Sequence, residues 1–293
     1  MTAIKHTLAQ GAVVDHYLIL GELGSGGFSN VYVAKHLKSG EQVVVKEYMP
    51  RKLSARNLHG GMVEVTDANR SLFEKGKQLF MHEAKILVDI KHPNIVEVLN
   101  FFNANNTIYL VMRYEKGENL GVYGRKHGHL SEKFIDIVFP KVIDGVRAMH
   151  DKGLLHLDIK PENIHIRPGG NPILLDFGAV HPFSKSRKYH PGRILSKGFS
   201  PIEQYQEDGY VGPWSDVYAL GATMRTCISG QVPADAETRH EKDRMKPLVK
   251  VIKKKYRNEL LDAIDWALGV EPISRPQNVD ALLDAMQHGR PVV

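Results

Sequence analysis

HLDIKPEN at residues 156–163 and DFG at residues 176–178 are the stretches that decide the fold of this chain. The first run places the carboxylate of Asp158 two residues before an amine and five residues before an amide. The second run follows the apolar segment ILL and adds the carboxylate of Asp176, with a glycine two residues later that permits a sharp turn. Each residue alone has an ordinary explanation, such as a helix-capping Asp, a turn Asn or a core His. Their order and spacing together indicate a catalytic site.

The residues before this block alternate between apolar and polar in the manner of strands. Predicted strands cover residues 13–23, 31–35, 41–48, 95–102 and 107–114. Residues 71–90 carry apolar side chains at helical spacing and predict one main helix. Residues 50–69 are polar and contain glycine, so we expect an insertion of loops there.

The residues after position 115 have the character of helices. Predicted helices cover residues 131–151, 216–228, 259–268 and 279–286. A β-rich half joined to an α-helical half predicts an α+β fold with a cleft between two lobes.

Gly24, Gly26 and Gly27 lie between two predicted strands. In a dinucleotide-binding fold such glycines would open a helix, and a P-loop would continue with Gly-Lys-Ser or Gly-Lys-Thr. Neither pattern follows here. A plain hairpin turn and a flap over a ligand are both open at this point. Lys46 favours the flap, because the alternation of its strand aims the ammonium toward the cleft, and Glu83 on the main helix is the candidate partner that such a charge needs.

With these residues in view, the chain resembles the protein kinase superfamily, and in detail the eukaryotic-like (Hanks-type) serine/threonine kinases of bacteria. The likeness runs from about Tyr17 to Arg275. It implies a bilobal protein-kinase fold, with a β-rich N-lobe that holds one main helix and an α-helical C-lobe. It also implies a single protein kinase domain over residues 1–293, with the N-lobe at about 12–115 and the C-lobe at about 116–290.

The resemblance assigns roles to the residues of the site. Asp158 would orient the attacking hydroxyl and accept its proton, Lys160 would neutralise the γ-phosphate, and Lys46 paired with Glu83 would position the phosphates. Asn163 and Asp176 would bind Mg²⁺, with Mn²⁺ as an alternative. The residues expected to bind ATP are Leu23, Gly24, Ser25, Gly26, Gly27, Phe28, Val31, Val44, Lys46, Met112, Tyr114, Glu115 and His165.

Four further positions have structural roles by resemblance. Glu203 would pair with Arg275, and Asp216 would brace the catalytic loop. Ser196 occupies the place of a threonine that hydrogen-bonds the catalytic Asp and Lys.

The implied activity is transfer of the γ-phosphoryl group of Mg-ATP to Ser and Thr hydroxyls of proteins, by a non-specific serine/threonine protein kinase that also phosphorylates itself. Lys160 favours Ser/Thr over Tyr, because tyrosine kinases usually lack a lysine there. Protein substrates are the expected partners of this signalling enzyme. The resemblance also implies a cognate protein phosphatase, which kinases of this family commonly have.

The sequence departs from the family pattern at Ser29, Val44, His165 and Leu157. Ser29 replaces the third loop glycine, Val44 a smaller residue above adenine, and His165 an aliphatic residue below it. Leu157 replaces an arginine that commonly pairs with a phosphate on the activation segment. We therefore expect activity to depend little on phosphorylation of that segment. We also expect its basic residues to favour acidic residues near the target hydroxyl; these are Lys185, Arg187, Lys188, Arg193 and Lys197.

Composition sets the broader class. The net charge of +6 permits anionic ligands, and 42% hydrophobic with 25% charged residues is an ordinary globular balance. No apolar run approaches the roughly 20 residues of a membrane span, and no secretory signal is evident. One cysteine, Cys227, cannot form an internal disulfide. These features predict a cytoplasmic protein without a membrane span, and nucleic acid is not an expected partner because no zinc-finger spacing or aromatic-studded basic patch occurs.

Three alternatives remain open. A pseudokinase that binds nucleotide as a scaffold predicts loss of at least one of Lys46, Glu83, Asp158, Asn163 and Asp176, and all five are present. A small-molecule phosphotransferase of the kinase-like fold would generally lack Lys160, the DFG turn and the Glu203 segment. A histidine-based metal hydrolase would need clustered histidines, and the 15 histidines of this chain are scattered.

Overall fold

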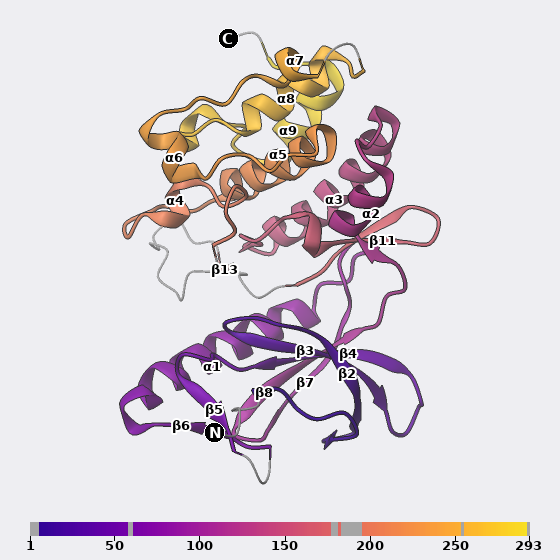
Figure 1. Cartoon of the computed structure of the whole chain (residues 1–293), viewed down its shortest axis with the longest axis vertical. Coiled ribbons are helices and arrows are strands. Elements are labelled where there is room, and N and C mark those ends of the chain that lie inside the picture. The colour runs from indigo at the N-terminus through magenta and orange to yellow at the C-terminus, as the bar shows by residue number, and fades with distance from the viewer. Residues whose placement is uncertain (1–5, 58–60, 177–180, 183–194, 253–254, 292–293) are drawn as a thin grey trace. The chain divides into compact units, whose positions relative to one another are not determined.

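The computed structural model describes the chain except for residues 1–5, 58–60, 177–180, 183–194, 253–254 and 292–293. The chain forms two compact units (Figure 1). The first comprises Met1–Lys91 with Val96–Glu115, and the second comprises His92–Ile95 with Lys116–Val293. None of the helices in the described part of the chain combines the length and the apolar character that crossing a membrane would need.

The first unit is built on an antiparallel sheet with the strand order β1-β2-β3-β4-β8-β7. Its strands are β1 (Val13–Val14), β2 (Tyr17–Ser25), β3 (Ser29–His36), β4 (Gln42–Tyr48), β7 (Val98–Ala104) and β8 (Thr107–Arg113). The period-2 alternation of the sequence places Ile19, Tyr32, Val45 and Val111 in one buried cluster. Lys46 and Tyr48 alternate with Val45 on β4, so their side chains lie on the other face of the sheet.

Helix α1 (Asp67–Val88) packs against β7 and β8 (Figure 1). Its buried residues Phe73, Ala84 and Leu87 follow helical spacing, so one stripe faces the sheet. Phe73 joins a second apolar cluster with Tyr48, Met49 and Ile108. The helix is thereby fixed against the same strand that carries Lys46.

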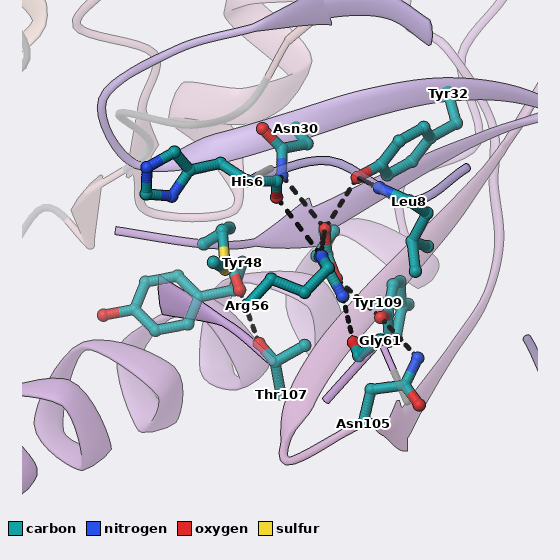
Figure 2. Close-up of polar contacts among 12 residues, drawn as sticks. His6, Leu8, Asn30, Tyr32, Tyr48, Arg56, Gly61, Asn105, Thr107 and Tyr109 are labelled. Atoms are coloured by element: carbon teal, nitrogen blue, oxygen red, sulfur yellow. Dashed lines mark hydrogen bonds and ion pairs between the residues drawn. The ribbon is translucent and has the colours of Figure 1, made fainter. Parts of the chain in front are cut away.

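Glu47 is the centre of a buried polar cluster that also contains Asn30, Tyr32, Arg56 and Tyr109. Its carboxylate accepts hydrogen bonds from Asn30 Nδ2 at 3.1 Å, Tyr32 Oη at 2.8 Å, Tyr109 Oη at 2.6 Å and Arg56 Nη2 at 2.5 Å. Figure 2 shows the hydrogen bonds of Asn30, Tyr32 and Arg56 meeting at one point. Burial, followed by the charge of Glu47, raises the pKa of both tyrosines. A buried charge is tolerated where it is paired and its remaining lone pairs are satisfied, and this cluster meets both conditions.

The expectation of loops over residues 50–69 is wrong. The segment contains a two-stranded hairpin of β5 (Ser54–Arg56) and β6 (Val63–Val65), and α1 begins at Asp67. Three-residue strands are too short to show a period-2 pattern, and Arg56 is buried because it reaches Glu47. The predicted strand over residues 13–23 is likewise two strands, because Asp15 adopts a positive φ of 51° between them.

The second unit is mainly helical. Its helices are α2 (Leu120–His127), α3 (Glu132–Asp151), α4 (Ile202–Tyr205), α5 (Pro213–Ser229), α6 (Ala236–Glu241), α7 (Leu248–Val251), α8 (Asn258–Ala267) and α9 (Val279–His288), with 3-10 turns η1 (Pro161–Asn163) and η2 (Pro272–Ser274). Helix α5 is buried along most of its length and packs against α3, α8 and α9. Ser131 caps α3 by accepting a hydrogen bond from Phe134 N at 3.3 Å, as its position before the apolar run predicts.

Short strands complete the second unit and flank residues 156–163. Strands β12 (Asn171–Leu174), β11 (Ile164–Arg167) and β9 (Glu118–Asn119) form one small sheet in that order. Strand β10 (Leu154–Leu155) pairs with β13 (His181–Pro182).

Candidate active site

The loop after β10 holds the carboxylate predicted as the catalytic base. Asp158 is buried, and Lys160 Nζ donates to its Oδ1 at 3.0 Å and its Oδ2 at 2.8 Å. Asn163 Nδ2 donates to Asp158 Oδ2 at 2.9 Å and to the Asp158 carbonyl at 2.8 Å. The turn η1 begins directly after Lys160 and returns Asn163 to Asp158, so one short run of sequence builds the whole cluster.

Ser196 joins this cluster from a distant part of the sequence. Its hydroxyl donates to Asp158 Oδ1 at 2.6 Å and accepts from Lys160 Nζ at 2.9 Å. The two hydrogen bonds expected of this position are therefore confirmed. The Asp158 carboxylate thus accepts hydrogen bonds from a lysine, an asparagine and a serine.

Asp216 of α5 fixes the backbone of the same loop. Its Oδ2 accepts from His156 N at 2.9 Å, and its Oδ1 accepts from Leu157 N at 2.8 Å. His150 Nε2 also donates to Oδ2, at 2.8 Å. Complete burial alone would raise the pKa of Asp216, but the hydrogen bond and charge of His150, together with His156, outweigh burial and lower it. The predicted brace is confirmed, with an ionised carboxylate at its centre.

Leu157 and Asp176 adopt positive φ angles of 59° and 57°. Such angles are uncommon for residues other than glycine, and they persist where the surroundings fix them, often at functional sites. At Leu157 the surroundings are known: Asp216 binds its N–H, Gln204 Nε2 donates to its carbonyl at 3.0 Å, and its side chain is 1% exposed. Leu157, the residue before Asp158, is thus a buried apolar residue whose backbone is held from two sides.

Asn163 and Asp176, the predicted metal ligands, are held near each other by the backbone. Leu175 N, next to Asp176, donates to the Asn163 carbonyl at 2.8 Å. The Asn163 amide nitrogen is committed to Asp158, so its amide oxygen remains as the atom able to bind a hard cation. An amide oxygen and a carboxylate are donors that suit Mg²⁺. Within the described ranges there is no group of three or more His, Cys, Asp or Glu side chains placed to hold a metal by themselves.

Glu203 and Arg275 form the predicted ion pair. Arg275 Nη1 donates to Glu203 Oε1 at 2.8 Å, and Nη2 donates to Oε2 at 3.0 Å. Both side chains are buried, and the guanidinium also donates to the carbonyls of Gly269 and Val270 and lies 4.9 Å from the centre of the Tyr218 ring. Because the remaining N–H groups of Arg275 bind backbone carbonyls, the ion pair can be buried with its hydrogen-bonding groups satisfied.

The glycine loop in the first unit is a hairpin between β2 and β3, as predicted, and no helix follows it. Gly26 N donates to Ser29 O at 2.8 Å, and the Gly27 carbonyl accepts from Arg51 N at 2.9 Å. A Cβ added at Gly24 or Gly27 would meet no atom within 4 Å. Packing inside the chain therefore does not require these glycines, which favours a role in close approach to a ligand.

Lys46 and Glu83 lie in the first unit and interact electrostatically. Lys46 is 3% exposed on β4, and Glu83 is half-buried on α1. Burial raises the pKa of Glu83 to about 8, although the positive charge of Lys46 opposes the rise. The charge of Lys46 therefore acts on Glu83, as the predicted pairing requires.

The other predicted nucleotide residues lie on strands or in the segments next to them. In the first unit, Val44 of β4 faces Met112 of β8 in the sheet register, and Tyr114 and Glu115 follow the end of β8 at Arg113. Leu23, Ser25, Phe28 and Val31 belong to the β2–β3 hairpin or its turn. In the second unit, His165 on β11 pairs with Asn119 and Ile173, and a Cβ at Gly117 would lie 2.9 Å from its Nε2.

Gln204 and His150 also support the loop that holds Asp158, and the sequence does not indicate either role. Gln204 follows Glu203, and His150 lies on the predicted helix over residues 131–151. Neither stands at a spacing that indicates its distant partner. Of the basic residues expected to choose the substrate, only Lys197 is described; Lys185, Arg187, Lys188 and Arg193 lie outside the described residues, as do Phe177 and Gly178.

Comparison with known proteins decides the family. The model of a family described as the protein kinase domain matches residues 17–288. The chain belongs to the protein kinase family. A solved structure titled "PpkA-294 apo form" is 31% identical to this kinase-family chain, with a TM-score of 0.83 over 97% of this chain and 100% of that one. The bilobal α+β protein-kinase fold predicted from the sequence is confirmed.

Curated relatives of this kinase-family chain come from animals and bacteria. It is 26% identical over 279 residues to Sperm motility kinase 3A of Mus musculus, covering 91% of this chain and 49% of that protein. It is 28% identical over 285 residues to Serine/threonine-protein kinase D of Synechocystis sp., covering 94% of this chain and 52% of that protein. The chain thus spans about half the length of the curated relatives it matches. The resemblance to eukaryotic-like serine/threonine kinases of bacteria is confirmed.

Proposed function

We propose that this chain is a serine/threonine protein kinase, which transfers the γ-phosphoryl group of ATP to Ser and Thr hydroxyls of proteins, including its own. The observation that carries the proposal is the cluster of Asp158, Lys160, Asn163 and Ser196. A buried carboxylate bonded to a lysine and an asparagine of one loop is what a hydroxyl-activating phosphotransferase needs. Membership of the protein kinase family supports it.

In this proposal the residues of the loop divide the chemistry. Asp158 orients the attacking hydroxyl and accepts its proton. Lys160, already within 3.0 Å of the Asp158 carboxylate, stabilises negative charge on the phosphoryl oxygens in the transition state. Asp216 and the fixed backbone at Leu157 hold the loop in place, so little reorganisation is required when substrate binds.

Nucleotide binding would fall to the first unit together with one strand of the second. We assign the phosphates to the Gly24–Gly27 turn and to Lys46, which Glu83 orients. We assign the adenine to Val44, Met112 and the residues Tyr114 and Glu115, with His165 of β11 on its other face. The two compact units would be the N-lobe and the C-lobe of one kinase domain.

Asn163 and Asp176 would hold the divalent cation, Mg²⁺ or Mn²⁺. When bound, the ion would neutralise charge on the phosphates and hold them in line with the acceptor. The donor set fits this ion, since one amide oxygen and one carboxylate leave the remaining positions to water and phosphate oxygens.

Asp158→Asn tests the proposed base. A positioned general base contributes about 10²- to 10⁴-fold, so transfer of labelled phosphate to a generic Ser/Thr acceptor should fall by that order. ATP binding, measured by calorimetry, should persist, because the substitution leaves the nucleotide residues in place. Asp151→Asn, an exposed Asp at the end of α3, is the matched control and should be as active as the wild type. Equal activity of Asp158→Asn and Asp151→Asn would refute the assignment.

The setting of the enzyme is part of the same proposal. We infer protein substrates in the cytoplasm and a signalling role. We also infer a cognate protein phosphatase, because related kinases commonly have one. Fractionation of cell extracts with an antibody to this chain tests the compartment, and recovery in the membrane fraction after a salt wash would contradict it.

A further inference from the structure

Tyr48 is on β4, and its ring packs against α1 at the position of Gly76. Its ring centre is 5.3 Å from that of Phe73 and 5.8 Å from that of Phe80, both on α1. Its hydroxyl donates to the Phe73 carbonyl at 3.4 Å. The ring points away from the Glu47 cluster (Figure 2). Tyr48 is buried, so this aromatic contact belongs to the core of the first unit.

Gly76 is the residue of α1 that faces the Tyr48 hydroxyl. It lies between Phe73 and Phe80 in the sequence of α1, inside a long helix where glycine is among the least favourable residues. A Cβ at Gly76 would lie 2.1 Å from the Tyr48 hydroxyl oxygen and 3.0 Å from its Cζ. No side chain fits there unless Tyr48 or the helix moves. The close approach of the tyrosine hydroxyl therefore explains the glycine.

Tyr48 has little freedom to move. Thr107, a buried residue at the start of β8, donates its hydroxyl to the Tyr48 carbonyl. The ring is held between two phenylalanines of the helix. A side chain at position 76 would therefore displace α1 rather than the strand.

The same strand and the same helix carry Lys46 and Glu83. Tyr48 follows Lys46 by two residues on β4, so both side chains leave the same face of the sheet. Glu83 follows Gly76 by seven residues on α1, which is about two turns, so both positions lie on the same face of the helix. The contact between Tyr48 and Gly76 and the interaction between Lys46 and Glu83 are thus two links between one strand and one helix face.

We propose that Tyr48 and Gly76 are positioning residues of the kinase: their contact sets how closely α1 approaches β4 and so places Glu83 opposite Lys46. The inference rests on the proposed function, in which Glu83 orients Lys46 toward the phosphates. It adds a packing contact to that function, outside the residues that touch nucleotide or acceptor. Larger residues at position 76 shift the helix, and removal of the Tyr48 hydroxyl relieves the shortest contact that their Cβ would make.

Gly76→Ala, Tyr48→Phe and the double variant test the contact. A displacement on the order of 1 Å costs about 10²-fold in a positioned site, so kcat/KM for ATP should fall about 10- to 100-fold in Gly76→Ala. The double variant Tyr48→Phe/Gly76→Ala lacks the oxygen that the new Cβ meets, so it should recover most of the loss. Gly124→Ala is the matched control, because Gly124 is a helical glycine of α2 whose Cβ would meet nothing within 4 Å, and its activity should be unchanged.

Glu83→Gln shows whether the effect passes through Glu83. In that background Gly76→Ala should cost no further activity, whereas a general loss of structure would lower it again. Wild-type activity in Gly76→Ala, or an undiminished loss in the Glu83→Gln background, overturns the inference. If Gly76→Ala alone does not fold, recovery of folding and activity in the double variant supports the contact, and failure of the double variant as well overturns it.

Denaturant unfolding of the same variants separates this inference from the proposed function. If the wild type transfers no phosphate, the proposed function fails. The packing contact is then judged by stability, where Tyr48→Phe should offset the destabilisation by Gly76→Ala. Additive effects of the two substitutions on stability would overturn the contact whatever the enzymatic result.

Discussion

Glu83 carries a carboxyl whose protonation differs between the folded and the unfolded chain. Burial raises its pKa from 4.5 to about 8, and Lys46 limits the rise. Between these values the folded protein holds a proton that the unfolded chain has released. Stability from this group is therefore full at low pH and is lost as pH rises through the window, by at most about 1.4 kcal/mol per pH unit.

Glu83→Gln should remove this pH dependence, because an amide does not titrate. We expect the free energy of unfolding of the wild type to fall relative to that of the variant as pH rises from about 4.5 to about 8. Denaturant titrations of both proteins without nucleotide measure the difference. Parallel stability curves across that window would show that Glu83 is ionised in the folded protein.

Single residues of the site were predictable where several of them lie close together in the sequence. Asp158, Lys160 and Asn163 lie within one run of eight residues, and the structure joins them in one cluster. Gln204 and His150 were not recognised, because each acts on a residue far away in the sequence. A hydrogen bond across such a separation leaves no spacing to detect. The buried roles of Glu47 and Arg56 were hidden for the same reason.

At the scale of elements, residues 196–204, at the expected end of the activation segment, contact the loop of Asp158 directly. Leu157 is buried and cannot bind a phosphate, while Gln204 and Asp216 already hold its backbone. Ser196 is bonded to Asp158 and Lys160 by its own hydroxyl. Ser196 and Gln204 are therefore held to the loop of Asp158 without a phosphorylated residue.

Ser184→Ala and Ser186→Ala should accordingly leave activity close to that of the wild type; both serines lie outside the described residues. Steady-state phosphorylation of a generic acceptor by each variant, with protein treated beforehand by a phosphatase, measures the effect. Ser196→Ala serves as the contrast and should be impaired, because it removes a hydrogen bond to Asp158. A large loss in either of the first two variants would mean that a phosphate orders the segment after all.

Long elements were predictable, and short ones were not. The apolar stripe of residues 71–90 and the Ser cap before residue 132 identified α1 and α3, and helices near residues 216, 259 and 279 also followed from their patterns. Helices α2, α4, α6 and α7 were missed, since four to eight residues rarely show a period of 3.6. The hairpin of β5 and β6 was missed because its buried positions include polar residues that tertiary contacts satisfy.

At the scale of the whole molecule, nucleotide binding should stabilise the folded chain. A ligand that binds the folded protein stabilises it by RT ln(1 + [L]/Kd), about 2.7 kcal/mol at a concentration about 100 times Kd. Mg-ATP should therefore raise the thermal unfolding midpoint, and the part that depends on Mg²⁺ should be lost in Asp176→Asn. Asp262→Asn, an exposed Asp of α8, is the control and should keep the full shift. The same shift with and without Mg²⁺ in the wild type would contradict the metal assignment.

The fold class of the whole chain could be predicted because two motifs and the order of strands and helices agree with one family. The arrangement of Lys46 with Asp158, Asn163 and Asp176 around one nucleotide goes beyond what either unit shows by itself, and it is the claim on which the proposed function depends.

Phosphoamino acid analysis tests that claim most directly. The wild-type protein is incubated with Mg²⁺, γ-labelled ATP and a generic protein acceptor, and the acceptor is then hydrolysed. We predict label in phosphoserine and phosphothreonine, dependent on Mg²⁺ and absent with Lys46→Met. Label confined to phosphotyrosine or to small molecules, or no transfer by a folded protein, would contradict the account.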